Sequence, residues 1–240
     1  MLVSLTIIRY PKLFIPLAFF AMALHRFSLW FNKKISFYKL MGCGRNGKFD
    51  RQPDLQQWAI LSAYPSMIGE PEDKNLLKNL YGGFISGWFH FFNCETFTIL
   101  LSPTEGHGLW DGKKVFEQSN NNTREPCTGN EVVAVLTRAT IRLSKLKYFW
   151  QHVAPVAAKM KTAKGFVMSF GIGEIPWIKQ ATFSIWESTA FMKAFAYGMQ
   201  EHVDVIKKTR QEKWYMEDMF VRFKVIKCVG TIKGIKPLNM

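Results

Sequence analysis

The predicted secondary structure repeats itself along the 240-residue chain, and this repeat constrains the fold more than any other feature. Hydrophobic spacing predicts the order strand, helix, strand, strand, helix, strand in each half. In the first half the predicted strands are 2–8, 35–41, 57–64 and 95–101, and the predicted helices are 13–31 and 72–91. In the second half the predicted strands are 131–141, 166–170, 180–186 and 219–229, and the predicted helices are 145–161 and 188–208. The Gly-x-Gly sequences at 42–44 and 171–173 predict matching turns between the two middle strands of each half.

This order is that of a ferredoxin-like βαββαβ unit, so the predicted fold class is α+β, with the unit duplicated in tandem. A single unit leaves one face of its four-stranded sheet uncovered, whereas two units can close on each other as an α+β barrel. We expect an N-terminal repeat at 1–115, a linker at 116–130, and a C-terminal repeat at 131–240 that carries the functional site. The whole stretch from 103 to 130 is polar and rich in Gly and Asn, which predicts a loop.

Alternation along the strands of the second repeat predicts which side chains face the barrel interior. In the strand at 131–141 the odd-numbered residues are plainly apolar and are expected to pack on helices, which turns Arg138 inward. In the strand at 180–186 the apolar set is Ala181, Phe183 and Ile185. The expected lining of an interior pocket is therefore Arg138, Thr182, Ser184, Trp186 and Arg222.

His202 lies on the apolar side of the predicted helix at 188–208, opposite this lining. A single histidine on such a face is often an ordinary core residue. A helical histidine that faces inward arginines can also ligate haem iron, with the arginines pairing with the haem propionates. His90 occupies the equivalent helix of the first repeat, within a segment that is typical of plain core.

The charge and motifs exclude several function classes. A formal net charge of +14 favours anionic partners, but the chain has no zinc-finger spacing, recognition helix or RNA-binding strand signature, so nucleic acid is not an expected partner. The sequence Gly42-Cys-Gly-Arg-Asn-Gly47 matches a dinucleotide fingerprint in letters only, because a loop and not a helix is predicted after it. No arrangement typical of hydrolases is found.

Cysteine usage and the N-terminus bear on location. The four cysteines are far apart and form no Cys-x-x-Cys pair, which fits a reducing cytoplasm better than a disulfide framework. The apolar stretch at 13–24 imitates a signal peptide, but it follows a predicted strand and is shorter than the roughly 20 residues needed to span a bilayer. We interpret it as a buried helix with a face that can touch lipid.

Aromatic residues make up 15% of the chain, which is typical of either a large core or a deep apolar cavity.

Several strings together resemble the spheroidene monooxygenase family, the carotenoid 2-ketolases. They run in the same order as in that family from the first strand to about residue 230. The strings are Phe37-Tyr-Lys-Leu-Met-Gly-Cys-Gly44, Leu109-Trp-Asp-Gly-Lys113, Leu136-Thr-Arg-Ala-Thr-Ile141, Gly171-Ile-Gly-Glu-Ile-Pro176, Thr182-Phe-Ser-Ile-Trp186 and Trp214-Tyr215. The family's helical histidine that precedes a Trp-aromatic pair corresponds to His202.

The resemblance implies a monooxygenase that contains haem b, with His202 as the iron ligand, and that receives electrons from a ferredoxin. It implies two successive hydroxylations of a terminal carbon of an acyclic carotenoid, followed by loss of water to give a ketone. A peripheral contact with the inner membrane and a homodimer are further expectations. Two alternatives stay open: a non-catalytic protein that carries haem or another apolar ligand, and a different haem reaction, such as dehydration or peroxidation, on the same barrel.

Overall fold

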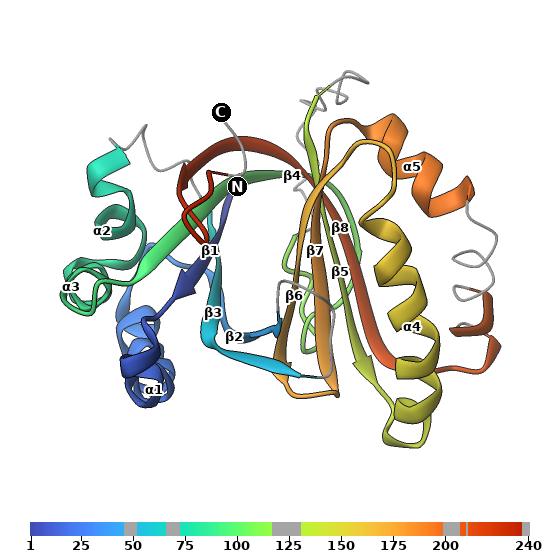
Figure 1. Cartoon of the computed structure of the whole chain (residues 1–240), viewed down its shortest axis with the longest axis horizontal. Helices are drawn as coiled ribbons and strands as arrows, with labels where there is room; N and C mark the ends of the chain where they lie inside the picture. The colour runs from blue at the N-terminus through green and yellow to red at the C-terminus, as the bar shows by residue number, and fades with distance from the viewer. Residues whose placement is uncertain (46–51, 66–72, 117–130, 199–206, 210, 237–240) are drawn as a thin grey trace. The chain divides into compact units, whose positions relative to one another are not determined.

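The computed structural model describes residues 1–45, 52–65, 73–116, 131–198, 207–209 and 211–236 (Figure 1). The elements of the first repeat are β1 (Leu2–Arg9), α1 (Ile15–Phe31), β2 (Phe37–Gly44), β3 (Pro53–Tyr64), α2 (Leu76–Tyr81), α3 (Gly83–Phe91) and β4 (Glu95–Gly108). Those of the second are β5 (Val133–Ile141), α4 (Leu146–Met160), β6 (Phe166–Ile175), β7 (Lys179–Trp186), α5 (Thr189–Gly198) and β8 (Tyr215–Gly230). Short 3₁₀ turns precede α1 (η1, Lys12–Phe14), α2 (η3, Asp73–Asn75) and α4 (η4, Leu143–Lys145).

The predicted fold class is confirmed. The strand order is β1-β3-β2-β6-β7-β5-β8-β4, which closes on itself as an α+β barrel of two βαββαβ units. Contacts along the chain divide it into two compact units, one made of 1–43, 54–102 and 225–240, and one of 44–53 and 103–224. The long strands β4 and β8 each begin in one unit and end in the other. The predicted boundaries at 1–115, 116–130 and 131–240 stay a prediction, and 117–130 lies outside the described residues.

In the first repeat β1 is the central strand, paired antiparallel with β3 and with β4. Helices α1, α2 and α3 cover one face of this sheet (Figure 1). The core between the helices and the sheet is apolar at both ends of β1, where Leu2 and Ile8 pack with residues of α1, α2 and α3. Its middle is polar, because Ser4 and Thr6 occupy the same face of β1.

In the second repeat β5 is the central strand, paired antiparallel with β7 and with β8. Helices α4 and α5 both lie on the same side of this sheet (Figure 1). They cover it through two separate apolar clusters. One joins Val133, Val135 and Trp186 to Met160 of α4 and to Met192 and Phe195 of α5. The other joins Ala139 and Ile141 to Phe149 and Trp150 near the start of α4.

The predicted helix at 72–91 is two helices, because Gly82 interrupts it. Gly82 has φ of +89°, which is the left-handed region that glycine adopts at little cost, and it ends α2 and begins α3. The predicted turn at Gly171–Gly173 is wrong. Both glycines lie within β6, and the chain reverses after Ile175, where Trp177 has φ of +65°. The predicted loop after residue 103 is also wrong in its first part, because β4 continues as a strand to Gly108.

Candidate functional site

The register of the second sheet corrects the predicted inward face. Thr137 of β5 lies directly opposite Thr182 of β7 and Phe220 of β8, so these three side chains share one face. Val135 likewise lies opposite Ser184 and Arg222. This face packs against α4 and α5, so Thr182, Ser184, Trp186 and Arg222 face the helices and not the side turned away from them.

Arg138 lies on the opposite face from those four residues. It pairs with Ala181 and Met219, on the face that also carries Leu136 and Phe183. The prediction that one surface gathers Arg138 with Arg222, Thr182, Ser184 and Trp186 is therefore wrong. The error has a physical cause: we assigned the polar residues of β7 and β8 to the interior. In the fold the face away from the helices carries Leu136 and Phe183, which are completely buried, and Arg138 is also buried there.

Among the described residues, a strip of the helix-facing surface stays exposed between α4 and α5. Thr137 is solvent-exposed at the centre of β5, although Val133, Val135, Ala139 and Ile141 on the same face are buried. It lies between the two apolar clusters described above, which bury the two ends of the strand. Thr182 and Phe220, its neighbours across β7 and β8, are half-buried. We call Thr137, Thr182, Phe220, Arg222 and His107 the open strip.

The equivalent position in the first repeat is filled. Thr6 is at the centre of β1 on the helix-facing side and is fully buried. The hydroxyl of Tyr81, from α2, lies 2.7 Å from Thr6 Oγ1 and 3.0 Å from Ser4 Oγ, and Thr98 Oγ1 lies 2.9 Å from Thr6 Oγ1. Burial raises the pKa of Tyr81, so the phenol stays protonated. Among the described residues, one helix-facing strip is therefore closed by Tyr81 and the other is exposed at Thr137.

Arg222 and His107 lie at the β8 side of the open strip. Arg222 forms an ion pair of 2.8 Å with Glu105, which is itself 55% exposed. Its Nε atom is buried and has no hydrogen-bond partner among the described residues. The imidazole of His107 stacks on the ring of Phe220, with 5.3 Å between ring centroids and 24° between planes. The strip therefore combines an apolar wall, two small hydroxyl side chains, a guanidinium with a free donor and a solvent-exposed imidazole.

Ser184 and Trp186 lie beyond the strip, inside the apolar cluster. Trp186 is 2% exposed and packs against Phe166 and Phe195, and its Nε1–H donates to Ser184 Oγ at 3.0 Å. The start of α5 is set here, where Ser188 Oγ accepts from the Phe191 backbone N–H at 3.3 Å. These side chains hold α5 against the sheet and support the strip from one end.

Arg138 is at the centre of an ion cluster. Its guanidinium pairs with Glu217, with Asp111 at 3.2 Å and with Glu174 at 3.5 Å, while its side chain is only 1% exposed. The indole of Trp110 stacks over it at 5.2 Å and donates from Nε1 to Glu174 at 2.8 Å. Three of the strings that resemble the family, those at 109–113, 136–141 and 171–176, meet in this cluster. They thus specify the packing of the second repeat.

The hairpin turn of this cluster follows from its Asp-Gly sequence. Asp111 and Gly112 have φ of +50° and +74°, the conformation of a type I′ turn, and Trp110 and Lys113 exchange backbone hydrogen bonds across it. The carboxylate of Glu217 accepts from the backbone N–H groups of both turn residues. Its partial burial raises the pKa of that carboxyl, but these N–H groups and Arg138 outweigh burial, so the net pKa lies below its ordinary value.

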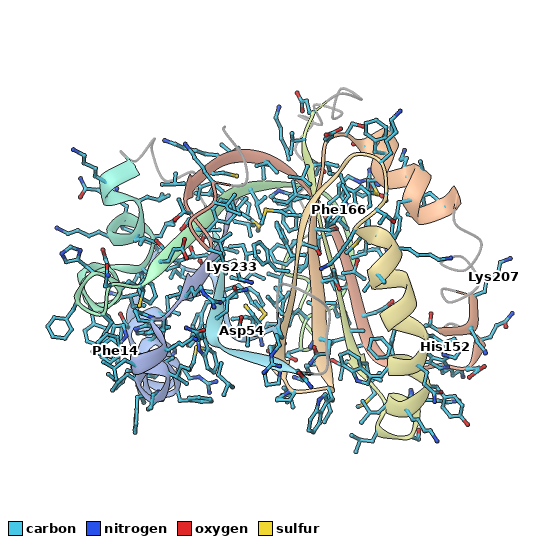
Figure 2. The ribbon with its side chains drawn as sticks, in the orientation of Figure 1. Phe14, Asp54, His152, Phe166, Lys207 and Lys233 are labelled. Atoms are coloured by element: carbon cyan, nitrogen blue, oxygen red, sulfur yellow. The ribbon has the colours of Figure 1, made fainter. Side chains whose placement is uncertain are left out.

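The predicted iron ligand His202 lies outside the described residues. Among the described residues no group of three or more His, Cys, Asp or Glu side chains is arranged for a metal ion. His90 is exposed on α3. His152 of α4 lies beside Trp214, with ring centroids 5.3 Å apart, and its Nε2 is 3.5 Å from Lys208 Nζ (Figure 2).

Sequence reasoning missed Thr137, Glu105 and His107. Thr137 falls among apolar residues of a central strand, and this break in an otherwise apolar alternation was the available signal. The sequence predicts a loop at Glu105 and His107, because the stretch from 103 to 130 is polar and rich in Gly and Asn. A Cβ on Gly108 would contact the backbone of Asp218 and Met219, so a glycine is required where β4 approaches β8.

Comparisons of the sequence find related proteins along most of the chain. No protein-family model matches it. Spheroidene monooxygenase of Rhodobacter capsulatus is 33% identical over 207 residues, which cover 85% of this chain and 81% of that protein. That of Rubrivivax gelatinosus is 36% identical over 205 residues, which cover 82% and 72%. That of Cereibacter sphaeroides is 30% identical over 219 residues and 91% of this chain, which spans 64% of the length of that relative.

Comparisons of the structure find the same fold in distant proteins. A crystal structure of an aldoxime dehydratase matches with a TM-score of 0.59 and 8% identity over 96% of this chain and 84% of that one. An aldoxime dehydratase in complex with butyraldoxime matches with a TM-score of 0.53 and 10% identity, over 94% and 79%. At such identity the likeness is one of fold.

Proposed function

Because the chain belongs to the spheroidene monooxygenase family, we propose that it is a haem-dependent, O₂-using monooxygenase that acts on a terminal carbon of an acyclic carotenoid such as spheroidene. Family membership supports the reaction class and the substrate class. The location that we propose for the reaction is the open strip, because the two described helix-facing surfaces differ there. Tyr81 closes the first surface over Thr6, whereas Thr137 is left exposed on the second.

We propose that the open strip holds the haem b group, and the chemistry of its described residues supports this. Haem is a flat, largely apolar ligand with two carboxylates, so a site for it would combine apolar side chains with a cation that pairs with the carboxylates. Phe220 supplies the wall and Thr137 and Thr182 the small side chains. The buried, unpaired Nε of Arg222 is a donor that a propionate would satisfy. His202 is proposed as the iron ligand, and Ser184 and Trp186 as support. Arg138 is not part of this site, because its guanidinium already binds three carboxylates.

Haem, when bound, supplies O₂ activation. Each hydroxylation converts C–H, O₂, two electrons and two protons into C–OH and H₂O. A second hydroxylation of the same carbon gives a gem-diol, which loses water to form the ketone. The chain's own residues would place the polyene end along the apolar wall formed by Phe220. His107, exposed beside Phe220, is positioned to pass solvent protons into the strip.

The partners and location follow from the substrate and the charge. A net charge of +14 suits a small acidic ferredoxin as the electron donor. Cys43, Cys94 and Cys228 are free thiols, which is consistent with the proposed cytoplasmic location. A carotenoid is dissolved in lipid, so we also propose a peripheral position at the inner membrane. A homodimer is a further proposal, on symmetry grounds alone.

The first alternative is a carrier that binds haem or carotenoid without turnover, and the second is a different haem reaction on the same barrel. We expect haem-loaded protein, supplied with reduced ferredoxin, spheroidene and isotopically labelled O₂, to form a product that contains the label, as seen by mass spectrometry. A carrier would return spheroidene unchanged. A product altered without incorporated label would favour the second alternative.

A matched pair of variants tests whether the product is formed at the open strip. Thr137→Trp fills the strip at a position that is already exposed, and we expect the rate of product formation to fall by at least about tenfold with little loss of stability. Ile226→Trp adds the same side chain at a position of β8 that is 38% exposed, and it should leave the rate unchanged. Equal rates in the two variants would contradict the proposed place of the reaction.

A further inference from the structure

Helix α1 has an apolar surface that is largely exposed among the described residues. Its buried stripe is Ala18, Ala21, His25 and Leu29, which packs on the first sheet with α2 and α3. The other side of the helix carries large apolar side chains that are 43–72% exposed, and we call this set the α1 patch: Phe19, Phe20, Leu24, Phe27, Trp30 and Phe31. Leu13 at its start and Phe84 and Phe91 of the adjacent α3 extend it, each more than half exposed. Exposed apolar surface of this extent marks an interaction site.

The helix lies along the first sheet and does not leave it. The segment Lys12–Phe31 is long and apolar enough to cross a membrane by length and composition, and 22% of it is buried. The buried residues recur every three or four positions from Ala18 to Leu29, so one side of the helix is attached to the core along most of its length. Phe14, just before α1 and labelled in Figure 2, also packs edge-on against Phe92. Their ring centroids are 5.2 Å apart. A helix held in this way can touch a bilayer only with its outer side.

The charges around the patch select an anionic surface. No acidic residue occurs before Asp50, while Lys12, Arg26, Lys33 and Lys34 flank or interrupt the patch and are all exposed. In a symmetric dimer through this patch the same basic residues would face each other, which is unfavourable. Trp30 in the last turn of α1, with Lys33 and Lys34 just beyond the helix, is the pattern of an interfacial helix end, where an aromatic ring and long basic side chains meet lipid headgroups.

We propose that the α1 patch docks on an anionic lipid bilayer, with α1 parallel to the membrane surface. The outer aromatic side chains enter the boundary between headgroups and acyl chains, and the four basic residues bind lipid phosphates. The benefit to the protein rests on the proposed function, since a substrate dissolved in the bilayer would then be reached without passing through water.

The test uses the full-length protein and vesicles that contain no carotenoid, so its result is independent of catalysis. We expect co-sedimentation with vesicles of phosphatidylcholine and phosphatidylglycerol, and weaker binding to phosphatidylcholine alone or at high salt. Phe20→Glu/Phe27→Glu should weaken binding by at least about tenfold. The control Leu143→Glu/Met216→Glu changes the net charge equally at residues that are 70% and 65% exposed in the second repeat, and it should bind as the unmodified protein does.

Three results would overturn the proposal. One is no binding to anionic vesicles. Another is an equal loss of binding in the two double variants, which would mean that net charge alone drives adsorption. The third is a dimer in sedimentation analysis that Phe20→Glu/Phe27→Glu converts to a monomer while binding to vesicles is unchanged. That result would assign the patch to a second copy of the chain.

As an independent measure, brominated lipids should quench the fluorescence of the unmodified protein more than that of Trp30→Phe.

Discussion

Replacing Arg138 with methionine is expected to lower the free energy of unfolding by about 3–5 kcal/mol, measured by urea denaturation at neutral pH. The side chain is 1% exposed, so its loss leaves Asp111, Glu174 and Glu217 close together without their shared cation. The Asp-Gly turn and the stacked Trp110 depend on the same carboxylates. The effect should therefore exceed that of any exposed ion pair in the chain.

Two further variants isolate the cause. Arg222→Met removes an arginine whose recorded partner Glu105 is 55% exposed, so we expect it to cost no more than about 1 kcal/mol. Adding Glu217→Gln to Arg138→Met should restore part of the loss, because one of the three neighbouring negative charges is removed. A cost below about 1 kcal/mol for Arg138→Met alone would mean that the cluster does not stabilise the fold.

The free energy of unfolding is also expected to fall by about 2 kcal/mol between about pH 7 and about pH 5 because of His25. Burial among Phe84, Trp88 and Phe89 lowers the pKa of His25 from 6.5 to about 4. A depressed histidine pKa means that the unfolded chain binds the proton first. The stabilisation is therefore complete above the unfolded pKa and is lost as the pH falls from 6.5 toward 4.

His25→Leu should abolish most of this pH dependence, as followed by urea denaturation at the two pH values. At pH 7 the free energy of unfolding of this variant should differ from that of the unmodified protein only through the change in packing. The reason is that His25 Nε2 has no partner among the described residues and leucine has no polar atom to bury. His90→Leu is the matched control, since His90 is an exposed histidine in the same repeat. An unchanged pH slope in His25→Leu would refute the assignment.

The order of elements could be predicted from the sequence because each element has a clear hydrophobic period. The faces of the strands in the second repeat could be predicted only in part. The odd-numbered residues of β5 do face the helices, as predicted, but Thr182 and Arg222 face them too. Polar residues under a helical layer conflict with simple amphipathic alternation, and that conflict is where the open strip lies.

Gly173 of β6 serves close packing between strands and not a turn. A Cβ at Gly173 would lie 2.7 Å from Gln180 Nε2 and 2.9 Å from the Lys179 carbonyl oxygen, so Gly173 permits the approach of β6 and β7 inside a strand. The polar composition that predicted a loop from residue 103 includes the last part of β4, which continues to Gly108. Neither effect can be read from local sequence, because both depend on a neighbouring strand. His202 and residues 117–130 lie outside the described residues, so what the sequence predicts for them stays a prediction.

The visible spectrum of the purified protein with added hemin tests the central claim most directly, recorded before and after dithionite and then carbon monoxide. We predict a Soret band that shifts when carbon monoxide binds, which requires an open coordination position on the iron. His202→Ala should lose this band while the chain stays folded, and Thr137→Trp should weaken hemin binding where Ile226→Trp does not. A protein that takes up no hemin, or an unchanged Soret band in both His202→Ala and Thr137→Trp, would contradict the account.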